Sequence, residues 1–233
     1  MSNRFLTPDI VLGAYENGLF PMADEHGQIG FYRYEPRGIV PLDDRFTIRR
    51  SLRQAMKKKD YRVTFDTAPL EVLRGCARAG LVHPKEMWLS DELLELYLRL
   101  FEMGRMHTVE IWSVEARGER RVASSEFSTD TTHAISDSPL ATRHSPLGRD
   151  VLVGGLYGLT FGAVFCGESM FSRAEYASQI ALVHLVERLR MKSFQLLDAQ
   201  MSSDHLKQFG LYEMSQQDYL ERFHNAASRD VKF

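Results

Sequence analysis

The spacing of apolar residues alternates along the chain between the period of a helix and that of a strand. Thr7 can cap a first helix, whose apolar face comprises Ile10, Val11, Ala14 and Tyr15. The same periodicity predicts further helices at 45–62, 68–79, 90–103, 174–190, 203–208 and 215–224. Strands are predicted around Pro36 within 29–41, and at 62–65, 107–115, 151–160, 162–170, 194–199 and 210–213. This mixed order favours an α+β or α/β sheet with an N-terminal subdomain.

Residues 116–150 interrupt this periodicity. The stretch SSEFSTDTTHAISDSPLATRHSPLG is rich in serine and threonine, and regularly spaced apolar residues vanish from it. Such a segment buries too little apolar surface to offset the cost of ordering its backbone. We therefore expect an extended or disordered loop here.

The composition is that of a globular protein. Of 233 residues, 44% are hydrophobic and 26% are charged, which excludes a wholly disordered or collagen-like chain. The net charge of −2 means that any binding of nucleic acid must come from a local patch. Two cysteines provide no disulfide framework, which favours a reducing compartment, the cytoplasm. The N-terminus lacks the apolar core of a signal peptide, and no apolar run is long enough to cross a membrane.

One local patch of positive charge is present in the segment 45–62. Its charged residues are eight cations and one acid: Arg45, Arg49, Arg50, Arg53, Lys57, Lys58, Lys59, Arg62 and Asp60. A run of charge is usually a solvated helix face. In a chain of slightly negative net charge, however, contact with phosphates is an obvious use for it. The candidate phosphate-binding residues are Arg49, Arg50, Arg53, Lys57, Lys58 and Lys59.

Three polar residues stand out in the apolar strands of the C-terminal half. Five glycines lie within 151–172, which indicates either a bulged hairpin or a ligand held close to the sheet. Glu168 lies in this run, and period two places it on the same strand face as Met170. Asp198 and Gln200 share a face at the end of the next strand, a frequent place for a site. Alternatively, Glu168 is solvated or ion-paired and Asp198 caps a helix.

Several common active-site motifs are missing from the sequence. The eight histidines lack the spacing of metal ligands, so we expect no metal. The chain has no nucleophile elbow and no phosphate loop, which leaves a serine hydrolase or a P-loop enzyme unsupported.

Four segments together resemble the leucyl/phenylalanyl-tRNA–protein transferases. They are LTPDIVLGAYENGLFPM (6–22), HTVEIW (107–112), LVGGLYGLTFGAVFCGESMFSRAEYAS (152–178) and the D-x-Q strand followed by DHLKQFG (204–210). The resemblance covers residues 6–112 and 151–223, and only the Ser/Thr-rich segment falls outside it. It implies an enzyme that moves Leu or Phe, and sometimes Met, from aminoacyl-tRNA to the α-amino group of proteins that begin with Arg or Lys. This addition marks those proteins for N-end-rule degradation.

The resemblance also implies a fold and a set of partners. The expected architecture is α+β, with a small N-terminal α/β subdomain at 1–66 and a C-terminal domain at 67–233 similar to the GNAT acetyltransferases. The insertion at about 116–150 belongs to the second domain. The expected partners are aminoacyl-tRNA and the acceptor protein, without a cofactor, a metal or a membrane, and the expected state is a monomer.

The family's site residues transfer to this chain where its motifs match. The catalytic residues implied are Asp198, Gln200 and Glu168: Gln200 contacts the attacking amine, Asp198 polarises or orients Gln200, and Glu168 attracts the cationic acceptor. The implied substrate-binding residues are Trp112 against the terminal adenosine, Leu156, Phe165, Met170, Leu185 and Leu189 around the aminoacyl side chain, and Phe31 and Tyr32 at the acceptor entrance. Phe31 and Tyr32 replace a common tryptophan pair, which changes the shape expected for that entrance.

Two other functions are compatible with the same residues. A related N-acyltransferase could use acyl-CoA, but the glycine-rich pyrophosphate motif of those enzymes is absent from this sequence. A tRNA-binding relative without activity would not need to retain Glu168, Asp198 and Gln200.

Overall fold

The computed structural model describes residues 6–24, 26, 28–79, 89–114 and 150–233. Its helices there are α1 (Pro8–Glu16), α2 (Arg50–Lys58), α3 (Pro69–Ala79), α4 (Asp91–Glu102), α5 (Ala177–Met191), α6 (Asp204–Lys207) and α7 (Gln216–Ala227). Its strands there are β1 (Phe20–Ala23), β2 (Ile29–Tyr32), β3 (Arg37–Val40), β4 (Tyr61–Phe65), β5 (Met106–Ser113), β6 (Val151–Phe161), β7 (Val164–Ser172), β8 (Leu196–Gln200) and β9 (Tyr212–Met214). The predicted α+β class is confirmed.

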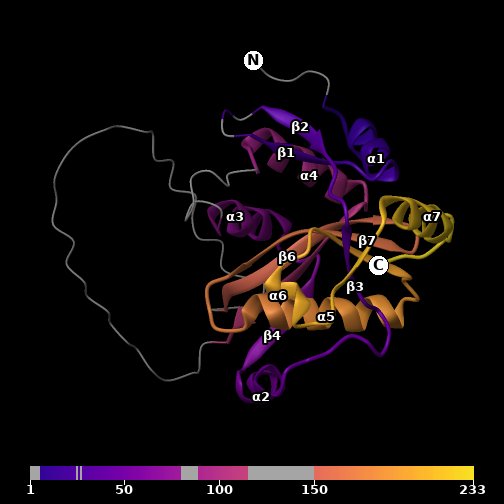
Figure 1. Ribbon diagram of the computed structural model, residues 1–233. Helices are drawn as coiled ribbons and strands as arrows, with labels where there is room; N and C mark the ends of the chain where they lie inside the picture. The colour runs from indigo at the N-terminus through magenta and orange to yellow at the C-terminus, as the bar shows by residue number, and fades with distance from the viewer. Residues whose placement is uncertain (1–5, 25, 27, 80–88, 115–149) are drawn as a thin grey trace, which may run out of the picture.

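A seven-stranded mixed sheet forms the centre of the fold (Figure 1). Its strand order is β4-β5-β6-β7-β8-β3-β9, and every neighbouring pair is antiparallel except β7 and β8. The strands β1 and β2 form a separate hairpin. The parallel pair requires a crossover, which α5 provides between β7 and β8.

Helices cover both faces of the sheet and bury two apolar clusters. Helix α5 packs on β5, β6 and β7, and its buried residues lie in one cluster with Leu156 and Phe165. Helices α1, α3, α4 and α7 pack over the other cluster, which contains Tyr97 and Tyr157. Since both faces are covered, the central strands are apolar on both sides.

Most predicted elements are present, but the basic helix is shorter than predicted. The prediction of a helix over 45–62 is wrong at both ends, because α2 spans only Arg50–Lys58. Residues before it are tied to the chain after α6: the Thr47 backbone N–H donates to the Phe209 carbonyl at 3.1 Å, and Phe46 stacks on Phe209. These tertiary contacts override helix propensity in the first turn. The strand β1 was not predicted at all.

The first 66 residues contribute two strands to the central sheet. β4 forms one edge, and β3 lies between β8 and β9. The division of the chain into domains at residue 66 stays a prediction. The predicted loop at 116–150 lies almost wholly outside the described residues. No helix among the described residues is long and apolar enough to span a membrane.

Candidate active site

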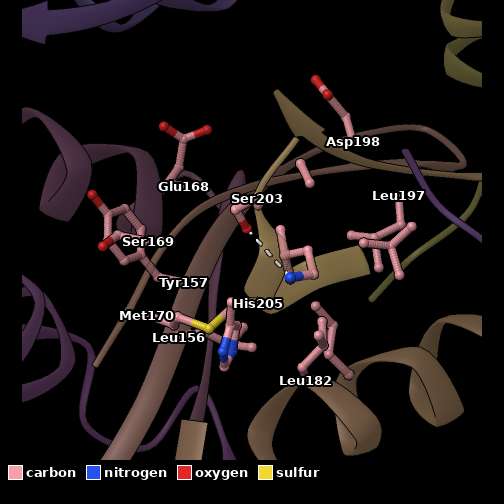
Figure 2. Close-up of a pocket in the computed structure, with 15 residues that line it drawn as sticks. Leu156, Tyr157, Glu168, Ser169, Met170, Leu182, Leu197, Asp198, Ser203 and His205 are labelled. Carbon is pink, nitrogen blue, oxygen red and sulfur yellow. Dashed lines mark hydrogen bonds between the residues drawn. The ribbon is translucent and has the colours of Figure 1, made fainter. Parts of the chain in front are cut away.

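An apolar cavity with a volume of about 220 Å³ opens between the sheet and helices α5 and α6. The residues around it are Val40, Leu156, Tyr157, Gly167, Glu168, Ser169, Met170, Leu182, Leu185, Leu197, Asp198, Ala199, Ser203, His205 and Leu206. In Figure 2 the aliphatic side chains gather on one side, and the carboxylates of Glu168 and Asp198 point to the other. The walls of this space, which we call the donor cavity, are therefore mainly apolar, and both carboxylates point away from its aliphatic side chains.

A second and smaller hollow of about 120 Å³ lies beside the donor cavity. It is lined by Phe20, Pro21, Met22, Glu168, Gln200 and Met201, and we call it the hairpin hollow because β1 supplies half of its lining. Glu168 lines both spaces. The two spaces therefore share one lining residue.

A β-bulge in β7 places the Glu168 side chain. Tyr157 pairs with Ser169 and Gly158 pairs with Gly167, so Glu168 has no partner in the register. Because of this extra residue, the prediction that Glu168 and Met170 share a face is wrong. Met170 packs in the cluster under α5, whereas Glu168 reaches the opposite cluster.

The Glu168 carboxylate is held by hydrogen bonds from two different elements. Tyr97 of α4 donates its hydroxyl to Oε2 at 3.0 Å, and Gln200 at the end of β8 donates its side-chain amide to Oε1 at 3.0 Å. The hydroxyl of Tyr15 lies 3.3 Å from that of Tyr97 and extends the network into α1. This network fixes the carboxylate on the side of the sheet away from α5.

Burial changes the acidity of these groups. Desolvation raises the pKa of Glu168 to about 7, although the hydrogen bonds from the tyrosines and Gln200 lower it. Burial also raises the pKa values of Tyr15 and Tyr97 well above their usual range, so both stay protonated. A carboxyl group that titrates near neutral pH is suited to accept or return a proton during catalysis.

The raised pKa predicts how stability depends on pH. Below pH 4.5 Glu168 is protonated in both folded and unfolded chains, and above about pH 7 the folded chain must bury its charge. Relative to a Glu168→Gln variant, the wild-type free energy of unfolding should therefore fall by up to about 3 kcal/mol between these pH values. Urea titrations of both proteins at several pH values measure this difference. A constant difference would show that Glu168 keeps an ordinary pKa.

Asp198 is fully buried, and each of its two carboxylate oxygens accepts two hydrogen bonds. Oδ1 accepts hydrogen bonds from Arg37 Nε at 2.9 Å and from the Gln200 backbone N–H at 2.8 Å. Oδ2 accepts from Arg37 Nη2 at 2.6 Å and from the Tyr219 hydroxyl at 2.9 Å. Burial opposes the charge on Arg37, but Asp198 more than compensates and raises the pKa of Arg37. The two side chains therefore form a buried ion pair.

The structure brings some of the predicted pocket residues together and separates others. Leu156, Met170 and Leu185 line the donor cavity. Phe165 and Leu189 are fully buried in the same apolar cluster but do not line that cavity. Trp112 is 4% exposed and packs in the opposite cluster, where its indole N–H donates to Thr64 Oγ1 at 2.8 Å.

The predicted acceptor entrance and phosphate-binding residues lie on the surface. Phe31 and Tyr32 are 39% and 38% exposed on the β1–β2 hairpin. Five of the basic residues are exposed and have no ion-pair partner within the described part of the chain: Arg49, Arg50, Arg53, Lys57 and Lys58. Lys59 differs, because its ammonium lies 3.2 Å from the Glu175 carboxylate.

Several residues of this site were not predicted from the sequence. Arg37, Tyr97 and Tyr219 make the contacts that hold the carboxylates, and they come from three elements far apart in the chain. Arg37 directly precedes the apolar stretch Gly38-Ile39-Val40, and a single arginine in that position could have indicated a buried ion pair. The described residues contain no group of three His, Cys, Asp or Glu side chains that could hold a metal.

Comparison with known proteins identifies relatives over most of the chain. A family model described as leucyl/phenylalanyl-tRNA protein transferase matches residues 39–119 and 143–224, and one for the N-terminal domain of the same proteins matches residues 5–33. The unmatched stretch between the two parts of the first match lies within the Ser/Thr-rich segment.

Curated relatives agree with the family models, and each carries the name leucyl/phenylalanyl-tRNA–protein transferase. One from Akkermansia muciniphila is 41% identical over 93% of this chain and 94% of its own length. Others from Paramagnetospirillum magneticum and Herpetosiphon aurantiacus are 39% and 37% identical, over 99% and 92% of this chain and over 93% and 91% of their own lengths. The chain therefore belongs to the leucyl/phenylalanyl-tRNA–protein transferase family.

Proposed function

We propose that this protein transfers leucine or phenylalanine, and also methionine, from aminoacyl-tRNA to the α-amino group of an acceptor protein. The observation that carries this proposal is that Glu168 lines both the donor cavity and the hairpin hollow. One space suits an apolar side chain, and the other is lined by Glu168 together with Gln200. An ester and an amine bound in the two spaces would lie next to each other.

The reaction needs little activation beyond this placement. The aminoacyl ester is already reactive, and an α-amino group with a pKa of about 7.7–8.0 is partly neutral near neutral pH. The amine nitrogen attacks the ester carbonyl carbon, the ester C–O bond breaks, and one proton moves from the amine to the terminal ribose oxygen. Gln200 contacts the amine, and Glu168, whose pKa is about 7, can relay that proton.

The hairpin hollow suits an acceptor that begins with arginine or lysine. Its walls are apolar at Phe20, Pro21 and Met22, and Glu168 supplies a carboxyl group. The hydrocarbon stem of a long basic side chain can pack on such walls while its cation faces a carboxylate. We propose this hollow as the acceptor site, and N-end-rule degradation as the fate of the modified protein. The arrangement in which β8 returns parallel to β7 after α5 supports the proposed GNAT-like relationship. A monomer in the cytoplasm stays our expectation.

A transfer assay tests this function directly. The protein is incubated with Phe-tRNA or Leu-tRNA and with peptides that begin with Arg, Lys or Ala. We expect transfer to the Arg and Lys peptides and much less to the Ala peptide. Equal transfer to all three would refute the acceptor assignment, and no transfer at all would refute the function. Tight binding of acyl-CoA with acyl transfer from it would favour the alternative donor.

The exposed cations of α2 and Arg49 supply a surface for tRNA phosphates. Replacing Arg53, Lys57 and Lys58 with alanine should raise the KM for aminoacyl-tRNA. In a plot of log KM against log salt concentration, the slope should fall by about two to three. Lys59 is left in place because it pairs with Glu175. The matched control replaces the exposed cations Lys192, Arg229 and Lys232. An equal change of slope in both triple variants would show that α2 is an ordinary solvated helix.

A further inference from the structure

The backbone of Gln200 adopts a conformation that side-chain-bearing residues rarely adopt. Its φ angle is 60°, in the left-handed region. The backbone N–H of Met201 donates to the carbonyl of Ala199 at 2.6 Å, which closes a γ-turn with Gln200 at its centre. A γ-turn with positive φ is strained, and it persists only where surrounding groups hold it.

Asp198 is one of the groups that hold this turn. Its Oδ1 accepts the backbone N–H of Gln200 at 2.8 Å, whereas the side-chain amide of Gln200 donates to Glu168. Asp198 therefore acts on the backbone of Gln200 and leaves the side chain free to reach into the hairpin hollow. The expectation that Asp198 polarises or orients Gln200 therefore takes a specific form here: Asp198 contacts the backbone of Gln200 and not its side-chain amide.

Arg37 determines where the Asp198 carboxylate lies. Two of its nitrogens donate to Asp198, one to each oxygen, and both side chains are completely buried. A third donates to the carbonyl of Gly18 at 3.2 Å, and the guanidinium lies 4.5 Å from the centre of the Tyr219 ring. This fork geometry fixes the orientation of a carboxylate in a way that a lysine could not.

The strand that carries Arg37 also makes room for the turn. Gly38 pairs with Gln200 in the register of β3 and β8, and the register shifts directly after it. A Cβ atom at Gly38 would lie 2.8 Å from the carbonyl carbon of Met201, well inside ordinary contact distance. In strand β3, Gly38 thus leaves space for the γ-turn, and Arg37 holds the carboxylate that anchors it.

We infer that Gln200 is positioned for aminoacyl transfer through its backbone N–H, which Asp198 accepts, and that Arg37 is required there because it holds and neutralises an acceptor that is a buried carboxylate. The inference rests on the proposed function for its catalytic consequence, and on the described contacts alone for the position of Gln200. For the position of Gln200, the ability of residue 198 to accept a hydrogen bond matters and its negative charge does not, so a neutral acceptor there makes Arg37 dispensable.

Two double variants separate these roles. Replacing Arg37 alone would leave a buried carboxylate unpaired and destabilise the fold, so both partners are changed together. In Arg37→Met with Asp198→Asn, the amide oxygen can still accept the Gln200 N–H, and the amide nitrogen can donate to Tyr219. In Arg37→Met with Asp198→Leu, that acceptor is lost. Thermal unfolding establishes that both variants fold.

The asparagine variant should keep kcat within about tenfold of wild type, because the acceptor for the Gln200 N–H remains. The leucine variant should lose about 100-fold in kcat, with little change in the KM for aminoacyl-tRNA. Equal losses in both would show that the charge of Asp198 is required and would overturn the inference. Equal retention of activity would overturn it as well.

A crystal structure of each variant provides a readout that does not depend on activity. We expect Gln200 to keep its positive φ and its contact with Glu168 in the asparagine variant and to relax in the leucine variant. A Gln200 that stays in place in the leucine variant contradicts the inference even if no transfer activity is found for the wild type. Absence of wild-type transfer with the expected structural difference would instead refute only the proposed function.

Discussion

Replacing Gln200 with alanine is expected to lower kcat for transfer by about 100-fold or more. The side-chain amide of Gln200 contacts Glu168 at 3.0 Å and Gln200 lines the hairpin hollow, so the substitution removes the group that we propose to contact the attacking amine. The KM for aminoacyl-tRNA should change little, because Gln200 does not line the donor cavity. Alanine tolerates the left-handed φ of 60° poorly, so thermal unfolding of the variant is measured alongside its kinetics.

The control for this variant is Gln195→Ala, which removes the same side chain from an exposed position just before β8. It should leave both kinetic constants close to those of wild type. A Gln200→Ala enzyme that folds normally and keeps kcat within about threefold of wild type would exclude Gln200 from the chemistry.

Shortening Leu156 to alanine should shift donor selection towards phenylalanine by about tenfold or more. Leu156 is 3% exposed and lines the donor cavity, so its truncation enlarges the space for the larger aminoacyl side chain. Competition between Phe-tRNA and Leu-tRNA for one acceptor peptide measures the ratio of the two kcat/KM values. The same truncation should cost about 2–5 kcal/mol of stability, because it removes buried methyl groups.

Leu159→Ala is the matched control. Leu159 lies on the same strand and is fully buried, but it packs in the cluster under α3 and α4 and does not line the cavity. Its truncation should destabilise the protein to a similar degree without changing the donor ratio. The same ratio in both variants would show that the donor cavity does not bind the aminoacyl side chain.

The sequence predicted elements well where local signals agree with the tertiary structure. Thr7 caps α1, Ser203 caps α6, and the apolar runs of 151–172 form the central hairpin β6–β7. Prediction was wrong where a distant segment decides the outcome. The chain before Arg50 does not form a helix because Thr47 and Phe46 contact the segment after α6.

In the candidate site, too, some residues were predicted from the sequence and others were not. Asp198, Gln200 and Glu168 are polar residues in apolar strands, so each is visible in a single sequence. The bulge that turns Glu168 away from Met170 depends on its pairing with β6 and leaves no signal in strand periodicity. Arg37 lies 161 residues before Asp198, and their pairing follows only from the order of strands in the sheet.

We propose that donor and acceptor meet near Glu168, which lines both the donor cavity and the hairpin hollow. A crystal structure with an amide-linked phenylalanyl-adenosine, which mimics the aminoacyl end of tRNA and resists transfer, tests it most directly. We expect the phenyl ring between Leu156, Met170 and Leu185, with the carbonyl carbon facing Gln200 and the hairpin hollow. A phenyl ring bound elsewhere, or a carbonyl group directed away from Glu168 and Gln200, would contradict the account.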